Sequence, residues 1–197
     1  MGSLHSQLLE GRMLEAEITY SGELAEQETA PLTTAFLKGL LARSREEPVN
    51  MVNARLTAES LGLRVKEATA TGAEDYASLL SARVRTEREE HTIAGTLFGK
   101  KEGRIVRFDE YSVDFVPAGP MVFTMHWDRP GVIGAVGALL GSNRINIAGM
   151  QVGRVRQGDL ALMVLAVDSP LPEPIIRRME ALDHIVRFIL GRDENHR

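Results

Sequence analysis

The residue types best suited to chemistry lie together between His126 and Ile133, directly after an apolar stretch. Asp128 and Pro130 are typical helix-start residues, since a carboxylate can cap unpaired amides and proline fixes φ where no amide is missed. Gly131 lets a ligand or a neighbouring backbone come close, and the amides at a helix N-terminus attract an anion. A carboxylate beside such a helix end suits a zwitterion, with Asp128 meeting an ammonium group. The pattern therefore indicates a binding site for a free amino acid rather than a catalytic centre.

We expect a second segment to join this site at Asn146, because the end of the first strand, the start of the helix and the start of the next strand should be neighbours. Each polar member also has a plain structural interpretation: His126 as a partly buried imidazole, Asp128 as a helix cap and Asn146 as a stabiliser of a strand entry. Their combination favours ligand binding. The candidate effector-binding residues are His126, Asp128, Gly131, Val132, Ile133, Asn146 and Ile147.

Other chemistries lack their motifs in this sequence. The nucleotide-binding spacings G-x-G-x-x-G and G-x-x-x-x-G-K-[ST] are absent. The glycines after Gly131 more simply give one helix face small residues, which allows close packing against a sheet or a partner. The histidines are too scattered for a metal site, and no G-x-S-x-G elbow occurs. The basic group Lys100, Arg104 and Arg107 could hold an anion, although a solvated hairpin rim is the simpler interpretation. The sequence thus predicts no catalytic residue, no metal ligand and no cofactor site.

Composition narrows the class of protein further. The chain has 197 residues, of which 44% are hydrophobic and 25% are charged, as in an ordinary soluble globular protein. A net charge of -4 argues against a binder of nucleic acid or membrane surfaces, and no apolar run approaches membrane-spanning length. The absence of cysteine excludes disulfides and thiolate-bound metals and makes the cytoplasm the expected compartment.

The second half of the chain reads as strand, helix, strand, strand, helix, strand. The expected strands are residues 121–127, 145–155, 160–167 and 184–190. One helix follows Gly131 and stops at Gly141, and Pro172 and Pro174 open the other. This order predicts a ferredoxin-like βαββαβ sandwich of about 70 residues. Because so small a domain buries a limited core, we expect a homodimer.

The first half is mixed, with helices followed by hairpins, which suggests a layer of helices over an antiparallel sheet. The expected strands are residues 13–20, 78–86, 91–98, 104–108 and 111–115, and the expected helices begin near Thr29 and Asn53. Two prolines and a glycine in residues 117–120 interrupt both strand and helix, so we place the domains at 7–118 and 119–192. The predicted fold class is therefore α+β, a mixed α/β domain followed by the ferredoxin-like one.

Several segments resemble those of a known family. They include YSGELAE at 20–26, LKGLL at 37–41, VNMVNA at 49–54, AGTLFG at 94–99, DRPG at 128–131 and INIAGMQVG at 145–153. In this order they are similar to the allosteric substrate-binding domain and the ACT domain at the regulatory end of long-form D-3-phosphoglycerate dehydrogenase. The resemblance spans nearly the whole chain.

This resemblance implies that the catalytic and NAD-binding domains lie upstream, so that the chain carries no cofactor itself and is inactive alone. It implies that L-serine binds where two ACT domains of a homodimer meet, and dimers could join into a tetramer. His126, Asp128 and Asn146 match the family's effector-binding positions. Arg104 matches a basic position of the family's anion site, whereas the neighbouring positions that are arginine in some relatives are not basic here.

Other functions stay open at this point. The chain could be the regulatory half of an L-serine dehydratase, whose iron–sulfur cysteines would have to come from another chain, although segments 20–22 and 37–41 favour the dehydrogenase. It could be another ACT module that senses a different amino acid. It could also be an active NAD-linked dehydrogenase, or a domain that dimerises and binds nothing.

Overall fold

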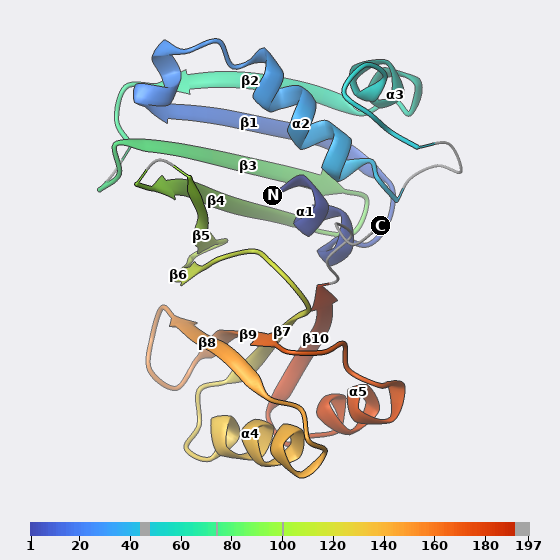
Figure 1. The fold of residues 1–197 in the computed structure, drawn as a ribbon, viewed down its shortest axis with the longest axis vertical. Coiled ribbons are helices and arrows are strands. Elements are labelled where there is room, and N and C mark those ends of the chain that lie inside the picture. The colour runs from blue at the N-terminus through green and yellow to red at the C-terminus, as the bar shows by residue number, and fades with distance from the viewer. Residues whose placement is uncertain (44–47, 74, 100, 192–197) are drawn as a thin grey trace. The chain divides into compact units, whose positions relative to one another are not determined.

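The computed structural model describes residues 1–43, 48–73, 75–99 and 101–191. They form two compact units that divide between Asp109 and Glu110, each with strands covered by helices (Figure 1). The predicted combination of helices and sheets, with a ferredoxin-like second domain, is confirmed. Within the described part of the chain, no helix is both long and apolar enough to cross a membrane.

In its described residues, the first unit holds three α-helices and five strands. The helices are α1 (Gly2–Leu8), α2 (Ala30–Leu40) and α3 (Ala54–Ser60), with a short 3-10 helix η1 (Glu23–Glu26). The strands are β1 (Met13–Gly22), β2 (Arg64–Ala70), β3 (Ser78–Thr86), β4 (Glu90–Phe98) and β5 (Glu102–Phe108), and neighbours follow the order β2-β1-β3-β4-β5.

The expectation of a wholly antiparallel sheet is wrong at one edge, where β1 and β2 pair in parallel. The chain reaches β2 through α2 and α3, and such a crossover returns it in the direction of β1. Strand β2 itself was not among the expected strands, because most of its side chains are exposed and it therefore lacks an apolar alternation. The remaining strand pairs of this unit are antiparallel, as expected.

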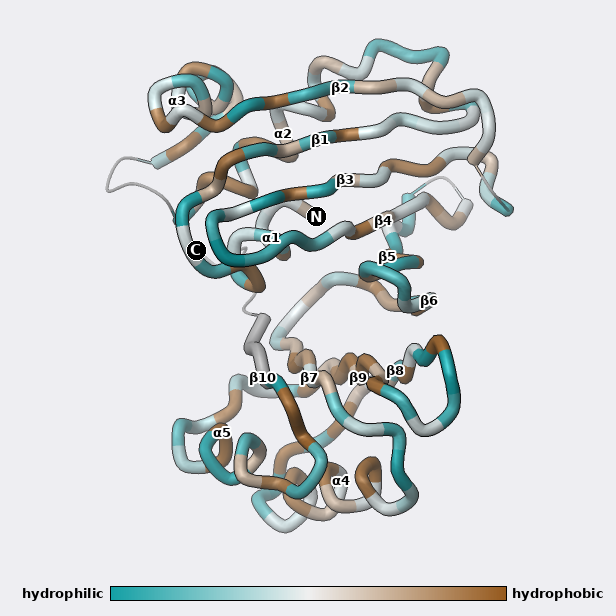
Figure 2. Tube along the Cα trace, turned by 180° about the vertical axis from the view of Figure 1, so that it is seen from behind, coloured by the Kyte–Doolittle hydropathy of each residue, from teal (hydrophilic) through white to brown (hydrophobic). Residues whose placement is uncertain are grey.

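The core of the first unit lies between the helices and one face of the sheet. Leu37 and Leu40 of α2 pack with Ile18 and Tyr20 of β1 and with Val84 of β3, and all five are almost fully buried. The face away from α2 is seen in Figure 2. Because side chains alternate along a strand, the residues between these core positions point to that other face.

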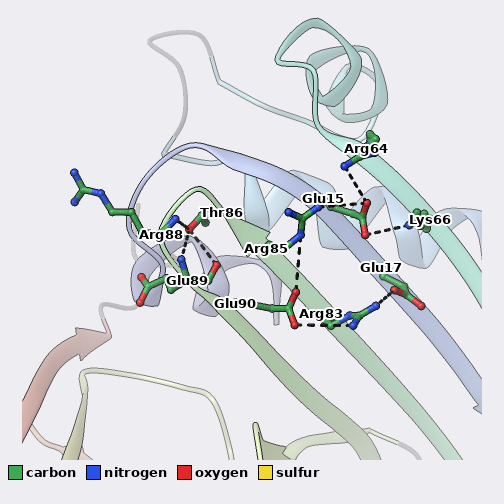
Figure 3. A network of polar contacts seen from close by, with 10 residues as sticks. All are labelled: Glu15, Glu17, Arg64, Lys66, Arg83, Arg85, Thr86, Arg88, Glu89 and Glu90. Atoms are coloured by element: carbon green, nitrogen blue, oxygen red, sulfur yellow. Dashed lines mark hydrogen bonds and ion pairs between the residues drawn. The ribbon is translucent and has the colours of Figure 1, made fainter.

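Ion pairs cover one end of this other face (Figure 3). The carboxylate of Glu15 on β1 lies 3.1 Å from the Lys66 ammonium and 3.4 Å from the Arg64 guanidinium, both on β2. On the other side of β1, Arg85 of β3 lies 3.8 Å from the same carboxylate, and Arg83 pairs with Glu17. The charges neutralise one another within the sheet, so this end of the face is a solvated polar surface.

The second unit contains strand β6 followed by the predicted βαββαβ order, which runs from β7 to β10. Its elements are β6 (Tyr111–Phe115), β7 (Met121–Trp127), α4 (Val132–Ser142), β8 (Ile147–Arg154), β9 (Leu160–Val167), α5 (Glu173–Glu180) and β10 (Ile185–Gly191). The last four strands form an antiparallel sheet of order β10-β7-β9-β8. Its core joins Val122 of β7, Val136 and Leu140 of α4, and Met163 and Leu165 of β9.

Strand β6 belongs to the second unit, which therefore also contains residues 117–120, where the sequence suggested the boundary. It lies against β8, since a Cβ atom added to Gly153 would come within 2.8 Å of the Ser112 carbonyl oxygen. The rings of Phe115 and Phe123 meet edge to face at 5.8 Å. Phe123 alternates with the core residue Val122, so β6 covers the sheet face that the helices leave open.

Candidate functional site

The end of β7 presents a buried histidine. His126 is only 2% exposed. Its side chain points to the same face of the sheet as that of Val122, four residues earlier, and therefore toward the core beneath the helices. Its Nδ1 is buried and has no hydrogen-bond partner among the described residues. Burial lowers the pKa of His126, although the charge of Asp128 and the backbone of Thr124 oppose this effect. The site therefore contains a neutral imidazole with an unused ring nitrogen.

The carboxylate of Asp128 does not cap α4, contrary to the sequence-based expectation. The N-cap is Gly131, in a left-handed conformation with φ of 95°, and no side chain caps the helix. Oδ2 of Asp128 instead accepts hydrogen bonds from the Gly158 amide and from Nη1 of Arg154, both at 3.3 Å. The Asp128 amide donates to the Asp159 carbonyl at 2.8 Å. These hydrogen bonds hold the loop before α4 against the β8–β9 hairpin.

These contacts set the charge at the site. The hydrogen bond from Gly158 is the main cause that lowers the pKa of Asp128, and Arg154 and His126 lower it further against the effect of burial. Asp128 is therefore ionised at neutral pH. The uncapped start of α4 leaves amide donors without a side-chain acceptor, and such a helix end attracts an anion.

Asn146 lies at the opposite end of the sheet from Asp128, so the expected proximity of the three segments is wrong within one chain. His126 pairs with Ala161 of β9, whereas Ile147 pairs with Val167, six residues further along that strand. This separation corresponds to about 20 Å. The reason is that α4 carries the chain back along the sheet, so that β8 starts at the same end of the sheet as β7, with β9 between them.

The apolar candidates divide between the core and the surface. Val132, the first residue of α4, is buried, whereas Ile133 is 46% exposed. A Cβ atom added to Gly134, Gly137 or Gly141 would meet nothing within 4 Å. This small-residue face of α4 therefore does not pack against its own sheet, and packing against a partner stays a prediction.

Three residues of the site were missed from the sequence, namely Arg154, Gly158 and Asp168. Asp168 accepts a hydrogen bond from Nδ2 of Asn146 at 2.9 Å. The hairpin pattern could have indicated Arg154, because its register places Arg154 opposite Ala161, the residue that His126 faces from the other side. Nothing in the sequence pattern pointed to Asp168.

The structure describes two of the three anion-binding candidates of the first unit. Lys100 lies outside the described residues, and Arg107 lies on β5 opposite Ala94. The Arg104 guanidinium lies 2.6 Å from the Glu102 carboxylate and 5.0 Å above the Phe98 ring. An anion at Arg104 would have to compete with that carboxylate.

The first unit also has a cavity of about 190 Å³ beside α3 and β2. Its lining residues are Leu37, Arg55, Ala58, Glu59, Leu63, Val65 and Glu67. Arg55 and Glu67 pair at 2.9 Å, and Glu67 accepts a hydrogen bond from Thr33, so these two charged groups at the cavity have partners of their own. In the described ranges, no three histidine, aspartate or glutamate side chains converge as a metal ion would require.

Comparison with known proteins matches both units. Residues 1–109 match the family described as the D-3-phosphoglycerate dehydrogenase intervening domain, and residues 121–184 match the ACT domain. The chain is 41% identical to D-3-phosphoglycerate dehydrogenase of Archaeoglobus fulgidus over 188 residues, which are 94% of this chain and 36% of that protein. It is 40% identical to the Synechocystis enzyme, over 89% of this chain and 32% of that protein. It is 36% identical to the Bacillus subtilis enzyme, over 94% of this chain and 35% of that protein. The chain spans about a third of the length of these relatives.

Proposed function

Because this chain belongs to the D-3-phosphoglycerate dehydrogenase intervening-domain family and carries an ACT domain after it, we propose that it is the regulatory region of such a dehydrogenase. In this proposal it binds L-serine where two ACT domains of a homodimer meet, and serine thereby controls its own synthesis. Catalysis and NAD binding belong to upstream domains of the longer protein, which would act in the cytoplasm.

The observation that carries the proposal is the ionised carboxylate of Asp128 beside the uncapped start of α4. A free amino acid has an ammonium group that complements this carboxylate and an α-carboxylate that complements the helix amides. The neutral imidazole of His126, two residues away, offers an unused ring nitrogen that could bond a hydroxyl or carboxylate. The three groups together recognise a small hydroxylated zwitterion.

A second copy of the chain supplies the missing side of the site. Strand β8 is an edge of the sheet and could pair antiparallel with β8 of a partner. Pairing about the centre of this strand would bring the partner's Asn146 to the end of β8 that holds Arg154, and hence beside Asp128. The exposed small-residue face of α4, with Ile133 at its start, would allow two such helices to approach closely.

The affinity of such a site suits a metabolite sensor. Each charge-assisted hydrogen bond contributes about 1.5–3 kcal/mol, and several kcal/mol of lost ligand freedom oppose the sum. Three or four contacts therefore leave micromolar to sub-millimolar affinity. Serine would change the enzyme's activity only if it bound one pairing of the ACT domains better than another, and a site shared by two chains provides that difference.

Calorimetry on this chain tests the proposal. We expect L-serine to release measurable heat, Asp128→Ala to abolish binding and Asn146→Ala to weaken it, while Asp183→Ala, at an exposed position of the same unit, serves as the control. NAD with 3-phosphoglycerate should give no change in absorbance at 340 nm. No heat from serine with a dimer confirmed by sedimentation would contradict the proposal, and heat from a different amino acid alone would change the assigned effector.

A further inference from the structure

Asp128 already has a cationic partner in the unliganded chain. Nη1 of Arg154 lies 3.3 Å from Oδ2 of Asp128, the same oxygen that the Gly158 amide contacts. The Asp128 side chain is 23% exposed, and that of Arg154 is 59% exposed. The guanidinium therefore reaches the carboxylate from the solvent side, where an incoming ligand would also arrive.

The two partners of Asp128 differ in how firmly they are held. The Gly158 amide belongs to the backbone of the hairpin turn, and the Asp128–Asp159 backbone hydrogen bond fixes the loop against that turn. Arg154 is a long, mostly exposed side chain, and an exposed ion pair of this kind is weak and easily exchanged. Gly158 can thus keep Asp128 in place while Arg154 leaves.

Resting on the proposed function, we propose that Arg154 is a built-in competitor for the effector, occupying the position at Asp128 that the effector's ammonium group takes. A second cation could not join Arg154 at that oxygen without charge repulsion, so the ammonium displaces the guanidinium. Arg154 therefore lowers the affinity of the site and sets the effector concentration at which it fills. It also restricts the effector to molecules with a cationic nitrogen, since a ligand with only a carboxylate gains nothing from displacing it.

The test compares L-serine binding to the 197-residue chain and to three variants by calorimetry. Arg154→Met keeps the aliphatic stem and removes the charge, and we expect it to bind L-serine two- to fivefold more tightly. Arg154→Lys keeps a competing cation and should stay close to the unaltered chain. Arg156→Met removes an exposed arginine from the same hairpin and should change nothing. Circular dichroism and sedimentation confirm that each variant folds and dimerises.

The outcomes separate the two proposals. If L-serine binds and the Asp128→Ala variant of the serine test does not bind it, but Arg154→Met leaves the affinity unchanged, the competitor role is wrong and the serine site stands. If Arg154→Met weakens binding, Arg154 contacts the ligand directly and the proposal is overturned. If neither the unaltered chain nor any variant binds L-serine, the proposed function itself fails. A shift of the Gly158 amide resonance on titration with serine would add direct support, because that amide reports on Asp128.

Discussion

Asn146 donates a hydrogen bond from Nδ2 to Oδ2 of Asp168 over 2.9 Å, and the Asp168 amide donates to the Asn146 carbonyl at 3.3 Å. This relationship fixes the orientation of the Asn146 amide, because an ionised carboxylate only accepts hydrogen bonds. Oδ1 of Asn146 is therefore turned away from Asp168. A ligand group that meets Asn146 at this oxygen has to be a donor, such as an ammonium or a hydroxyl.

Replacing Asp168 with asparagine should weaken effector binding about twofold without changing stability. The new side chain can donate as well as accept, so the Asn146 amide can take either orientation, and the competent one falls to about half. Calorimetry with L-serine measures the change, with Asp183→Asn as the matched surface control. An unchanged affinity would mean that the orientation of Asn146 does not matter for binding.

Replacement by alanine should destabilise the chain at one glycine of β8 and have little effect at another. A Cβ at Gly153 would lie 2.8 Å from the Ser112 carbonyl oxygen and 3.0 Å from Tyr111 Cβ, so Gly153→Ala should push β6 away and cost about 1–3 kcal/mol. A Cβ at Gly149 would meet only Ala166 at 3.8 Å, so Gly149→Ala should change stability by less than about 0.5 kcal/mol. Urea unfolding of both variants checks the pair. Equal losses would show that β6 does not rest on β8.

The elements of the second unit were predictable because their signals are local. The apolar run 121–127 and the nearly continuous apolar run 160–167 appear as β7 and β9 with those bounds, and Gly131 marks the start of α4. The parallel edge strand β2 was not predictable in this way, since it has few buried side chains and is held by backbone pairing with β1. A strand defined mainly by its neighbour leaves little pattern in its own sequence.

The proximity of His126, Asp128 and Gly131 was predictable from the sequence, but the contacts around them were not. His126, Asp128 and Gly131 do lie together at the end of β7, because the chain connects them directly. The partners of Asp128 could not be foreseen, since a helix start and a hairpin tip both offer amides, and only the folded loop decides between them. Asn146 was misplaced because strand direction in the sheet, rather than closeness in sequence, sets its position.

The stability of the first unit should fall as the pH is lowered from about 6.5 toward 3, owing to His5 on α1. Burial, chiefly, lowers the pKa of His5 to about 3 from an ordinary 6.5, while its Nε2 lies 3.1 Å from the Ala82 carbonyl oxygen. In this pH window His5 is protonated in the unfolded chain and neutral in the folded chain, so stability rises with pH. The loss between pH 7 and pH 5 should be about 2 kcal/mol.

Urea unfolding at pH 7 and pH 5 measures this effect. His5→Gln retains a donor toward the Ala82 carbonyl and removes the titration, so the variant should show a smaller pH dependence than the unaltered chain. The difference between the two pH slopes isolates His5 from the carboxylates that both chains share. Identical slopes would show that His5 is not held neutral in the folded state.

A large side chain on the small-residue face of α4 should separate the proposed dimer without unfolding the chain. Gly137 has open space around its Cβ position, and leucine is the better helix former by about 0.5–1 kcal/mol, so Gly137→Leu should leave each folded chain at least as stable. The larger side chain would keep two α4 helices apart. Sedimentation velocity should then show a monomer with weakened serine binding, whereas Arg178→Leu on α5 should remain dimeric.

Mixing the non-binding Asp128→Ala variant with the weakly binding Asn146→Ala variant should restore native affinity at some sites if each effector site takes Asp128 from one chain and Asn146 from its partner. Asp128→Ala removes the first group and Asn146→Ala the second, so both sites of either homodimer are damaged. In a heterodimer of the two variants, one site receives both intact residues and the other receives both alanines. Half of the dimers in an equimolar, fully exchanged mixture are heterodimers, so about a quarter of all sites should regain native affinity.

Calorimetry of the mixture after unfolding and refolding together measures the restored fraction, and separately refolded variants mixed without exchange provide the control. Restoration in this form cannot come from one chain, because Asp128 and Asn146 lie about 20 Å apart at the two ends of the same sheet. No recovery after confirmed exchange, in variants that each dimerise, would show that the two residues do not share a site. Recovery with a quarter of the native stoichiometry would place Asp128 of one chain beside Asn146 of its partner, once at each end of the paired β8 strands.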